Sequence, residues 1–192
     1  MPARYIYQID SARIRPLTGA KTEKVAFLKR KGFQIPKSMV CVSDAYDHYR
    51  ADRTDVVETL SAELDQYIAP ERRYAVRSSA NVEDQLNHSF AGQFKSVLNV
   101  QGIDEVWQGI WSIWATADSK RVQTYLEKNG LSPEELKMAV LIQEMVDVQV
   151  AGVAFSKNPL TGMDEIVIEA VNGSGEKLVQ RGHTPQRWIY KW

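Results

Sequence analysis

The apolar positions of this chain recur with two spacings, one typical of helices and one typical of strands. Apolar residues four positions apart form a single stripe from Val56 to Ile68, which predicts an amphipathic helix that ends before Pro70. Residues 18–32 carry helix signals at both ends, and residues 103–114 form the next expected helix. The predicted helices therefore come mainly first.

Strand-like apolar runs dominate the later part of the chain. A short buried strand is expected at residues 39–42. After Lys137, four more candidate strands are separated by Gly, Asn and Pro turns, at residues 138–146, 150–155, 166–171 and 187–190. Helices mainly first and strands mainly last, without internal repeats, favour an α/β or α+β fold.

Composition limits the partners and the cellular location. The 192 residues, 44% of them hydrophobic, can bury a core as one domain or as two small subdomains. Lys plus Arg equals Asp plus Glu at 24 each, so neither nucleic acid nor a membrane is expected as a partner, and any anion site must be local. With the single cysteine Cys41, no apolar run near about 18 residues and no signal pattern, a cytoplasmic protein is expected.

The stretch with the most chemistry runs from Ala75 to Val100, as A-V-R-S-S-A-N-V-E-D, then S-F-A-G-Q, then L-N-V. An apolar pair leads into Arg77 and two serines, a loop with Gly92 follows, and a second β-type run ends the stretch. Strand, loop and strand would bring a planar cation, hydroxyl donors and backbone N–H groups near one point, as a polyphosphate requires. The residues alone therefore predict a triphosphate clamp.

These motifs resemble the nucleotide-binding domain shared by phosphoenolpyruvate synthases, pyruvate phosphate dikinases and rifampin phosphotransferases. Residues 152–162, G-V-A-F-S-K-N-P-L-T-G, are similar to the G-V-A-F-T-R-N-P-x-T-G segment of the dikinases. Weaker similarities are Gly19-Ala20-Lys21, which resembles G-G-K, and residues 173–176 ahead of Thr184-Pro185. Together the matches span nearly the whole chain.

The resemblance implies an α+β fold, the first lobe of an ATP-grasp-like domain in which two lobes close over one ATP. Residues 1–192 would form this N-terminal lobe, with the second lobe and the phosphohistidine domain absent. Because the sequence stops inside a predicted strand near Trp192, a truncated chain is expected rather than a naturally short protein. The acidic ligands of Mg would belong to the missing lobe, so no metal ligand is expected here.

Five positions of this sequence match residues that contact ATP in the family. Arg77 would be catalytic and would stabilise charge on the transferring phosphates, while Lys21 would orient them. Gly92 and Ser96 would cover the phosphates. Gln143, in the run V-L-I-Q-E-M-V, would lie where a strand meets the hinge that holds adenine.

Each of these positions has a structural alternative. Lys21 could be a solvated lysine, and Arg77 could form an ion pair with Glu83 or Asp84. Gly92 and Ser96 could belong to a plain hairpin turn, and on pattern alone Gln143 could lie in an ordinary buried strand. Relatives often have L-P-x-A where this chain has Q-L-N-H at residues 85–88, which leaves the path of the loop open.

The implied function is that of the ATP-binding part of a phosphotransferase. Mg-ATP would give phosphate to a mobile histidine domain, which would pass it to pyruvate and form phosphoenolpyruvate. The partners would be the nucleotide and the phosphohistidine and pyruvate-binding domains of the full-length protein, and the isolated chain would be inactive. The alternatives are a rifampin- or glucan-type dikinase lobe and a non-catalytic regulatory module.

Two other features have a structural interpretation. Trp107, Trp111 and Trp114 recur at helical spacing, which predicts the core face of a helix rather than a platform for bases. The three histidines are widely spaced and have no cysteine neighbours, so neither a zinc site nor a nucleophile pair is expected.

Overall fold

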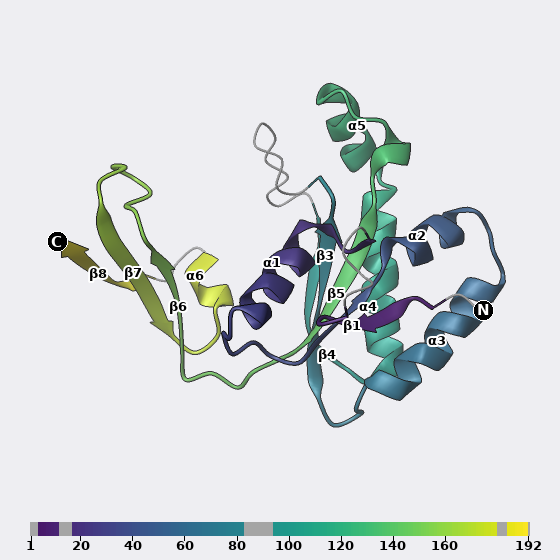
Figure 1. The fold of residues 1–192 in the computed structure, drawn as a ribbon, viewed down its shortest axis with the longest axis horizontal. Helices are drawn as coiled ribbons and strands as arrows, with labels where there is room; N and C mark the ends of the chain where they lie inside the picture. The colour runs from purple at the N-terminus through teal and green to yellow at the C-terminus, as the bar shows by residue number, and fades with distance from the viewer. Residues whose placement is uncertain (1–3, 12–16, 83–93, 180–183, 192) are drawn as a thin grey trace. The chain divides into compact units, whose positions relative to one another are not determined.

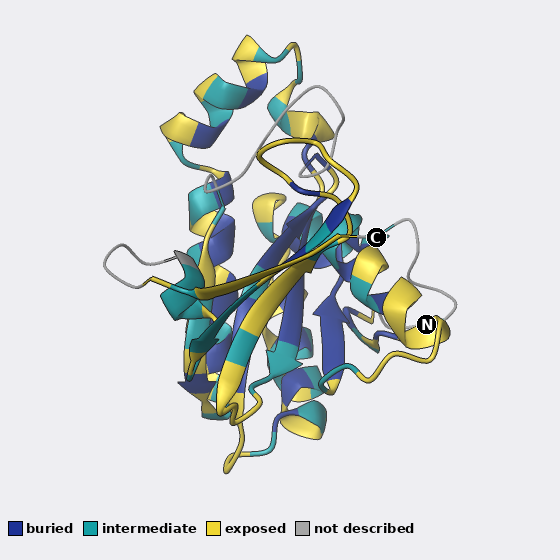
Figure 2. Ribbon diagram, turned by 90° about the vertical axis from the view of Figure 1, so that its left-hand side faces the viewer, coloured by how far each residue is buried: buried dark blue, intermediate teal, exposed yellow. Residues whose placement is uncertain are grey.

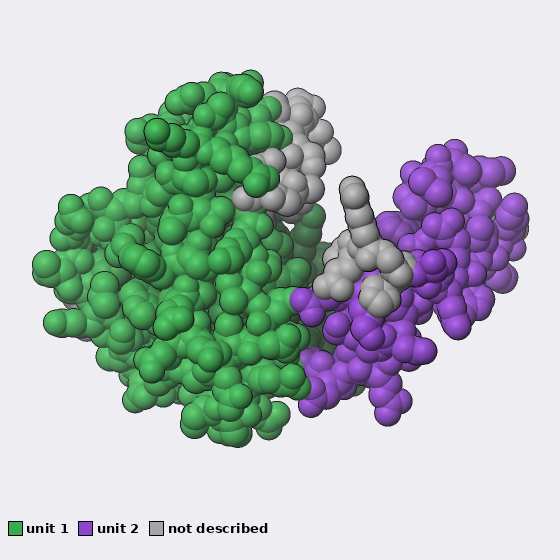
Figure 3. All heavy atoms as spheres, turned by 180° about the vertical axis from the view of Figure 1, so that it is seen from behind, with its two compact units in different colours: residues 1–145 green, residues 146–192 purple. Residues whose placement is uncertain are grey.

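The computed structural model describes residues 4–11, 17–82, 94–179 and 184–191. The chain divides into two compact units, Met1–Met145 and Val146–Trp192 (Figure 3). Each unit is built around its own antiparallel sheet. The α+β class predicted from the sequence is therefore confirmed, and of the two domain arrangements that the length permits, the structure adopts two subdomains.

The first unit contains a five-stranded sheet in the order β1-β2-β5-β3-β4 (Figure 1). Every neighbouring pair of its strands is antiparallel. The strands are β1 (Ile6–Gln8), β2 (Ser38–Cys41), β3 (Arg73–Ala80), β4 (Ser96–Gln101) and β5 (Met138–Glu144). The strand that comes last in the sequence, β5, thus lies at the centre of the sheet.

Helices cover both faces of this sheet (Figure 1). On one face lies α1 (Gly19–Arg30), whose Ala26 packs with Leu141 of β5 and with Ile9. The other face carries α2 (Ser43–Arg50), α3 (Asp55–Tyr67) and α4 (Gly102–Ala117). After α4 the chain forms α5 (Lys120–Lys128) and a short 3-10 turn, η2 (Pro133–Glu135).

The main core lies between the sheet and the α2–α4 face, and Figure 2 shows the central strands as buried. Val56, Leu60 and Leu64, the predicted stripe of α3, are fully buried there. A side chain at Gly109 of α4 would lie 3.1 Å from Val76, which shows how closely this helix packs on β3.

The prediction for the tryptophans is correct only in part. Trp114 is buried and Trp107 packs partly buried against the core, with its ring edge-on to that of Trp114. Trp111, however, is 55% exposed and donates its Nε1 hydrogen to the hydroxyl of Tyr49. The amphipathic face of α4 is therefore narrower than the spacing of its tryptophans predicted.

The second unit is a three-stranded antiparallel meander in the order β6-β7-β8. Its strands are β6 (Val150–Phe155), β7 (Glu165–Asn172) and β8 (Gln186–Lys191), and the short helix α6 (Glu176–Val179) follows β7. Among the described residues of the whole chain, no helix is long and apolar enough to cross a membrane.

Candidate functional site

Three predicted site residues share one face of the first sheet. Arg77 of β3 lies directly opposite Ser96 of β4, and Ala75, two residues earlier on β3, lies opposite Gln143 of β5. Opposite residues of an antiparallel pair point to the same face, and so do residues two apart on a strand. The side chains of Arg77, Ser96 and Gln143 therefore point to the same side of the sheet.

This face is the one that α1 covers. Arg77 lies opposite Leu141, and the Leu141 side chain packs on Ala26 of α1. Lys21, in the first turn of α1, donates a hydrogen bond from Nζ to the carbonyl oxygen of Ser78 at 2.6 Å. The lysine of the helix thus reaches the residue next to the predicted catalytic arginine.

Gly19 explains why α1 can approach β3 so closely. Its φ is +67°, a conformation that favours glycine, and a Cβ atom at this position would lie 2.0 Å from the carbonyl oxygen of Ser79. The weak similarity at Gly19-Ala20-Lys21 therefore has a steric basis in this fold, which is backbone contact between the start of a helix and a strand.

The two serines after Arg77 lie inside the fold. Both Ser78 and Ser79 belong to β3 and are buried. The hydroxyl donors that the sequence suggested for a polyphosphate are thus part of the interior packing, and the sequence carried no signal that Ser79 bonds to α1.

Gln143 is held near the boundary between the two units. Its Nε2 donates to the hydroxyl of Ser38 on β2 at 2.9 Å, and Ser38 donates in turn to the carbonyl oxygen of Pro36. Two residues later the N–H of Met145 donates to the carbonyl oxygen of Arg73, and the first unit ends at that residue. The role of Gln143 beside the adenine stays a prediction.

Part of the predicted clamp lies outside the described residues. Gly92 falls within residues 83–93, and so do Glu83 and Asp84, the alternative ion-pair partners of Arg77. The assignment of Gly92 to the phosphates and the ion-pair alternative both stay predictions.

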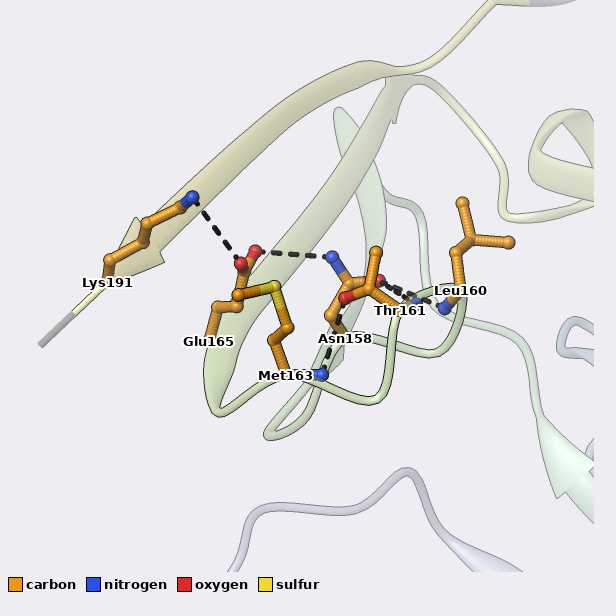
Figure 4. Close-up of polar contacts among 6 residues, drawn as sticks. All are labelled: Asn158, Leu160, Thr161, Met163, Glu165 and Lys191. Carbon is orange, nitrogen blue, oxygen red and sulfur yellow. Dashed lines mark hydrogen bonds and ion pairs between the residues drawn. The ribbon is translucent and has the colours of Figure 1, made fainter.

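In the second unit, the segment S-K-N-P-L-T-G forms a turn held by a buried amide (Figure 4). Oδ1 of Asn158 accepts hydrogen bonds from the N–H groups of Leu160 and Thr161, and its Nδ2 donates to Glu165 Oε2 at 3.2 Å. Lys191 Nζ lies 3.5 Å from the other oxygen of this carboxylate. Sequence reasoning did not single out Asn158 or Glu165, although an Asn-Pro pair is a known turn signal.

Other reactive groups of the described residues are placed for structural roles. Cys41 is buried, and burial raises the pKa of its thiol, so it stays neutral and is a poor nucleophile. His48 Nδ1 lies 3.0 Å from the hydroxyl of Tyr5. The described ranges contain no group of three or more His, Cys, Asp or Glu that could hold a metal ion.

The α+β fold with antiparallel sheets is consistent with an ATP-grasp-like nucleotide-binding domain. The family model for the pyruvate phosphate dikinase AMP/ATP-binding domain matches residues 53–191, which is well over half of the chain. The chain therefore belongs to the AMP/ATP-binding domain family of pyruvate phosphate dikinase.

Curated relatives agree with this assignment. The chain is 39% identical over 141 residues to a probable phosphoenolpyruvate synthase of Methanothermobacter thermautotrophicus, covering 72% of this chain and 20% of the relative. It is 42% identical over 120 residues to a phosphoenolpyruvate synthase of Aeropyrum pernix, covering 62% and 15%. It is also 38% identical over 127 residues to a rifampicin phosphotransferase of Bacillus subtilis, covering 66% and 14%.

These matches fix the family and leave the acceptor open. The chain spans at most about a fifth of the length of these relatives. Their names refer to two different compounds, phosphoenolpyruvate and rifampicin. The similarity therefore supports a nucleotide-binding part of a phosphotransferase, without a choice between these reactions.

Proposed function

We propose that this chain is the ATP-binding N-terminal lobe of a dikinase-type phosphotransferase, and that the triphosphate lies on the α1 face of the first sheet. One observation carries the proposal. Arg77, Ser96 and Gln143 share this face, and α1 brings Lys21 to the same strand. A planar cation, a flexible cation and a hydroxyl on one surface match the charges and acceptors of a polyphosphate.

The residues would act by positioning and by neutralising charge, because phosphoryl transfer needs little covalent chemistry from the protein. Arg77 would stabilise the charge on the transferring phosphates through its fork of N–H donors. Lys21 would orient them as a point charge at the end of a flexible side chain. Ser96 and Gly92 would cover the phosphates, and Gln143 would lie near the adenine.

Magnesium would accompany ATP in this family, but the described residues do not supply a ligand set for it. Carboxylates and water are the usual ligands of Mg²⁺ beside phosphates. We propose that carboxylates of the second, ATP-grasp-type lobe of the complete protein supply these ligands.

The complete protein would pass phosphate from ATP to a histidine domain and from there to pyruvate, which forms phosphoenolpyruvate. Two of the relatives above bear the name phosphoenolpyruvate synthase, which favours this acceptor. Similarity to a rifampicin phosphotransferase favours the second candidate, an antibiotic as the acceptor.

The test is a phosphate-transfer assay on the complete protein. The protein is incubated with Mg and with ATP labelled in its β and γ phosphates, and acid-labile label on the protein is measured. The label is then chased with pyruvate or with rifampicin in parallel samples. We expect loss of label to pyruvate. Loss to rifampicin alone would establish the second candidate, and ATP binding without any labelling would establish a non-catalytic nucleotide-binding module.

A further inference from the structure

One buried hydroxyl connects the start of α1 to β3. Ser79 Oγ donates to the carbonyl oxygen of Thr18 at 2.6 Å and accepts from the backbone N–H of Thr22 at 3.0 Å. It also lies 2.9 Å from Thr22 Oγ1, whose hydroxyl donates to it. All three residues are at most 1% exposed. One donor and two acceptor positions are the full hydrogen-bonding capacity of a serine hydroxyl.

Ser79 joins the first turn of α1 to β3. The N-cap residue of α1 is Thr18, and its side chain makes no capping hydrogen bond. The Ser79 hydroxyl bonds both to the carbonyl oxygen of Thr18 and to the backbone N–H of Thr22, the fourth helical residue after the N-cap. Ser79 is 57 positions after Thr22 in the sequence, so a distant strand holds the first turn of the helix.

The Ser79 hydroxyl lies close in sequence and in space to the two elements that carry the cations. Thr18 and Thr22 stand on either side of Lys21 in the sequence, so bonds to both fix the turn that carries the lysine. Ser79 is two residues after Arg77 on the same strand, and its side chain points to the same face. A single hydroxyl therefore sets the position of the Lys21 helix relative to the strand that carries Arg77.

We propose that Ser79 is a positioning residue for ATP, which holds the Lys21 ammonium at a fixed place relative to the Arg77 guanidinium. This inference rests on the proposed function of those two cations. Ser79 does not touch the nucleotide, because its hydroxyl is buried and already fully bonded. Its contribution is preorganisation: without these bonds, part of the affinity for the triphosphate is lost in ordering the helix start.

The close backbone contact at Gly19 does not replace these bonds. Steric contact with the Ser79 carbonyl limits how near α1 can come to β3. It does not stop the helix from sliding or rotating along the strand. Hydrogen bonds are directional, so the Ser79 hydroxyl is the element that fixes the register.

The test is a double-mutant cycle on the affinity of the complete protein for ATP, measured by calorimetry. Lys21→Met alone should weaken binding about ten- to a hundredfold, the effect of losing a charge-assisted contact. Ser79→Ala alone should weaken binding about tenfold. In the Lys21→Met background, Ser79→Ala should have almost no further effect, because there is no ammonium left to position.

Two more variants separate positioning from general stability. Thr22→Val keeps the side-chain shape and removes one bond to Ser79, so it should weaken ATP binding by a few fold in the normal background only. Ser43→Ala removes a hydroxyl that is buried without a partner among the described residues, at the start of α2 on the opposite face. It should leave ATP affinity unchanged.

The outcomes distinguish failure of this inference from failure of the proposed function. If Lys21→Met weakens ATP binding while Ser79→Ala and Thr22→Val do not, the positioning role of Ser79 is wrong. The proposed contact between Lys21 and phosphate is then still supported. Equal effects of Ser79→Ala in both backgrounds would also overturn the positioning role, because the serine would then act independently of the lysine. If Lys21→Met has no effect, the proposed phosphate contact fails and the positioning role fails with it. If the Ser79→Ala protein does not fold, the effect of Thr22→Val on ATP affinity in the two backgrounds tests the positioning role instead.

Discussion

At the scale of single residues, the proposed site combines two cations that would have different tasks. Arg77 lies on a strand and is partly buried, so its guanidinium starts from a well-defined place. Lys21 reaches the same strand from a helix at the end of a flexible side chain. A planar fork suits bidentate contact with phosphate oxygens, whereas an ammonium acts as a point charge. The arginine should therefore matter more for transfer.

The first prediction ranks these cations in the complete protein. Arg77→Ala should lower phosphate transfer about ten- to a hundredfold or more, because a charge-assisted contact to phosphate is worth roughly 1.5–3 kcal/mol. Arg77→Lys should restore little of it, and exposed Arg72 provides the control Arg72→Ala, which should behave as wild type. Turnover is measured with labelled ATP. Full activity of Arg77→Lys together with loss of activity in Lys21→Ala would reverse the two roles.

The second prediction concerns the contact between Gly19 and Ser79. A methyl group at Gly19 would clash with a backbone carbonyl, and φ at this position is positive. Gly32 also has a positive φ, but a Cβ there meets nothing within 4 Å. Gly32→Ala should therefore cost about 1–2 kcal/mol of unfolding free energy, and Gly19→Ala about 1–3 kcal/mol more.

Urea unfolding followed by circular dichroism measures this difference. If Gly19→Ala and Gly32→Ala lower the free energy of unfolding by similar amounts, α1 can move away from β3 without a loss of stability. The close approach would then not be needed for the stability of the first unit.

At the scale of elements, the turn from Asn158 to Glu165 is the best-defined feature of the second unit (Figure 4). The N–H of Asn158 donates to the carbonyl oxygen of Met163, and the N–H of Gly162 donates to the carbonyl oxygen of Asn158. The Asn158 side chain closes the turn from inside and binds Glu165, which is 4% exposed. The family-like sequence of this segment therefore encodes a fixed turn.

The third prediction tests this turn. Asn158→Ala leaves the N–H groups of Leu160 and Thr161 without their side-chain acceptor and removes the amide donor to Glu165 Oε2, at a cost of about 1–3 kcal/mol. Hydrogen exchange at these two amides should become faster. The control is Leu160→Ala, since this side chain is 79% exposed. Unchanged exchange in Asn158→Ala would show that the backbone alone holds the turn.

The sequence predicted the elements with strong periodicity well, and it predicted the short strand β2 to within one residue, but it missed β1 and α6. The stripe from Val56 to Ile68 became α3, and the run at residues 150–155 became β6 without a change of bounds. β1 has three residues and α6 has four, too few for a period to be visible. Their existence depends on pairing and packing with distant segments, which local patterns do not record.

The candidate site was predictable only in part for the same reason. Similarity of motifs led to Lys21 and Arg77, and the structure brings their elements together. The hydroxyl of Ser79 was misassigned to a ligand because the sequence does not show that Thr22 lies against it. A contact between residues so far apart in sequence becomes visible only when the sheet and α1 are placed.

At the scale of the whole molecule, the chain is much shorter than the relatives that it matches. The relatives that it matches are several times longer, and the chain covers 14% to 20% of them. Acceptor binding and metal binding would then depend on residues outside this sequence. The fourth prediction follows from this size.

We predict that the 192-residue chain alone shows no ATP hydrolysis and no autophosphorylation above background. Labelled ATP with Mg provides the assay, and the complete protein under the same conditions is the control. Stable labelling of His48, His88 or His183 in the isolated chain would contradict the prediction, because the chain would then contain its own metal site and acceptor.

The central place of β5 in the first sheet has a consequence for biosynthesis. β2 and β3 both pair with β5, and neither pairs with the other. Closing the sheet therefore requires contacts between residues about a hundred positions apart, which makes folding slow. While the chain leaves the ribosome, β2 and β3 keep unpaired edges that can bind other chains. Translation through Glu144, the end of β5, rather than formation of the helices, therefore sets the earliest moment at which the five-stranded sheet can be complete.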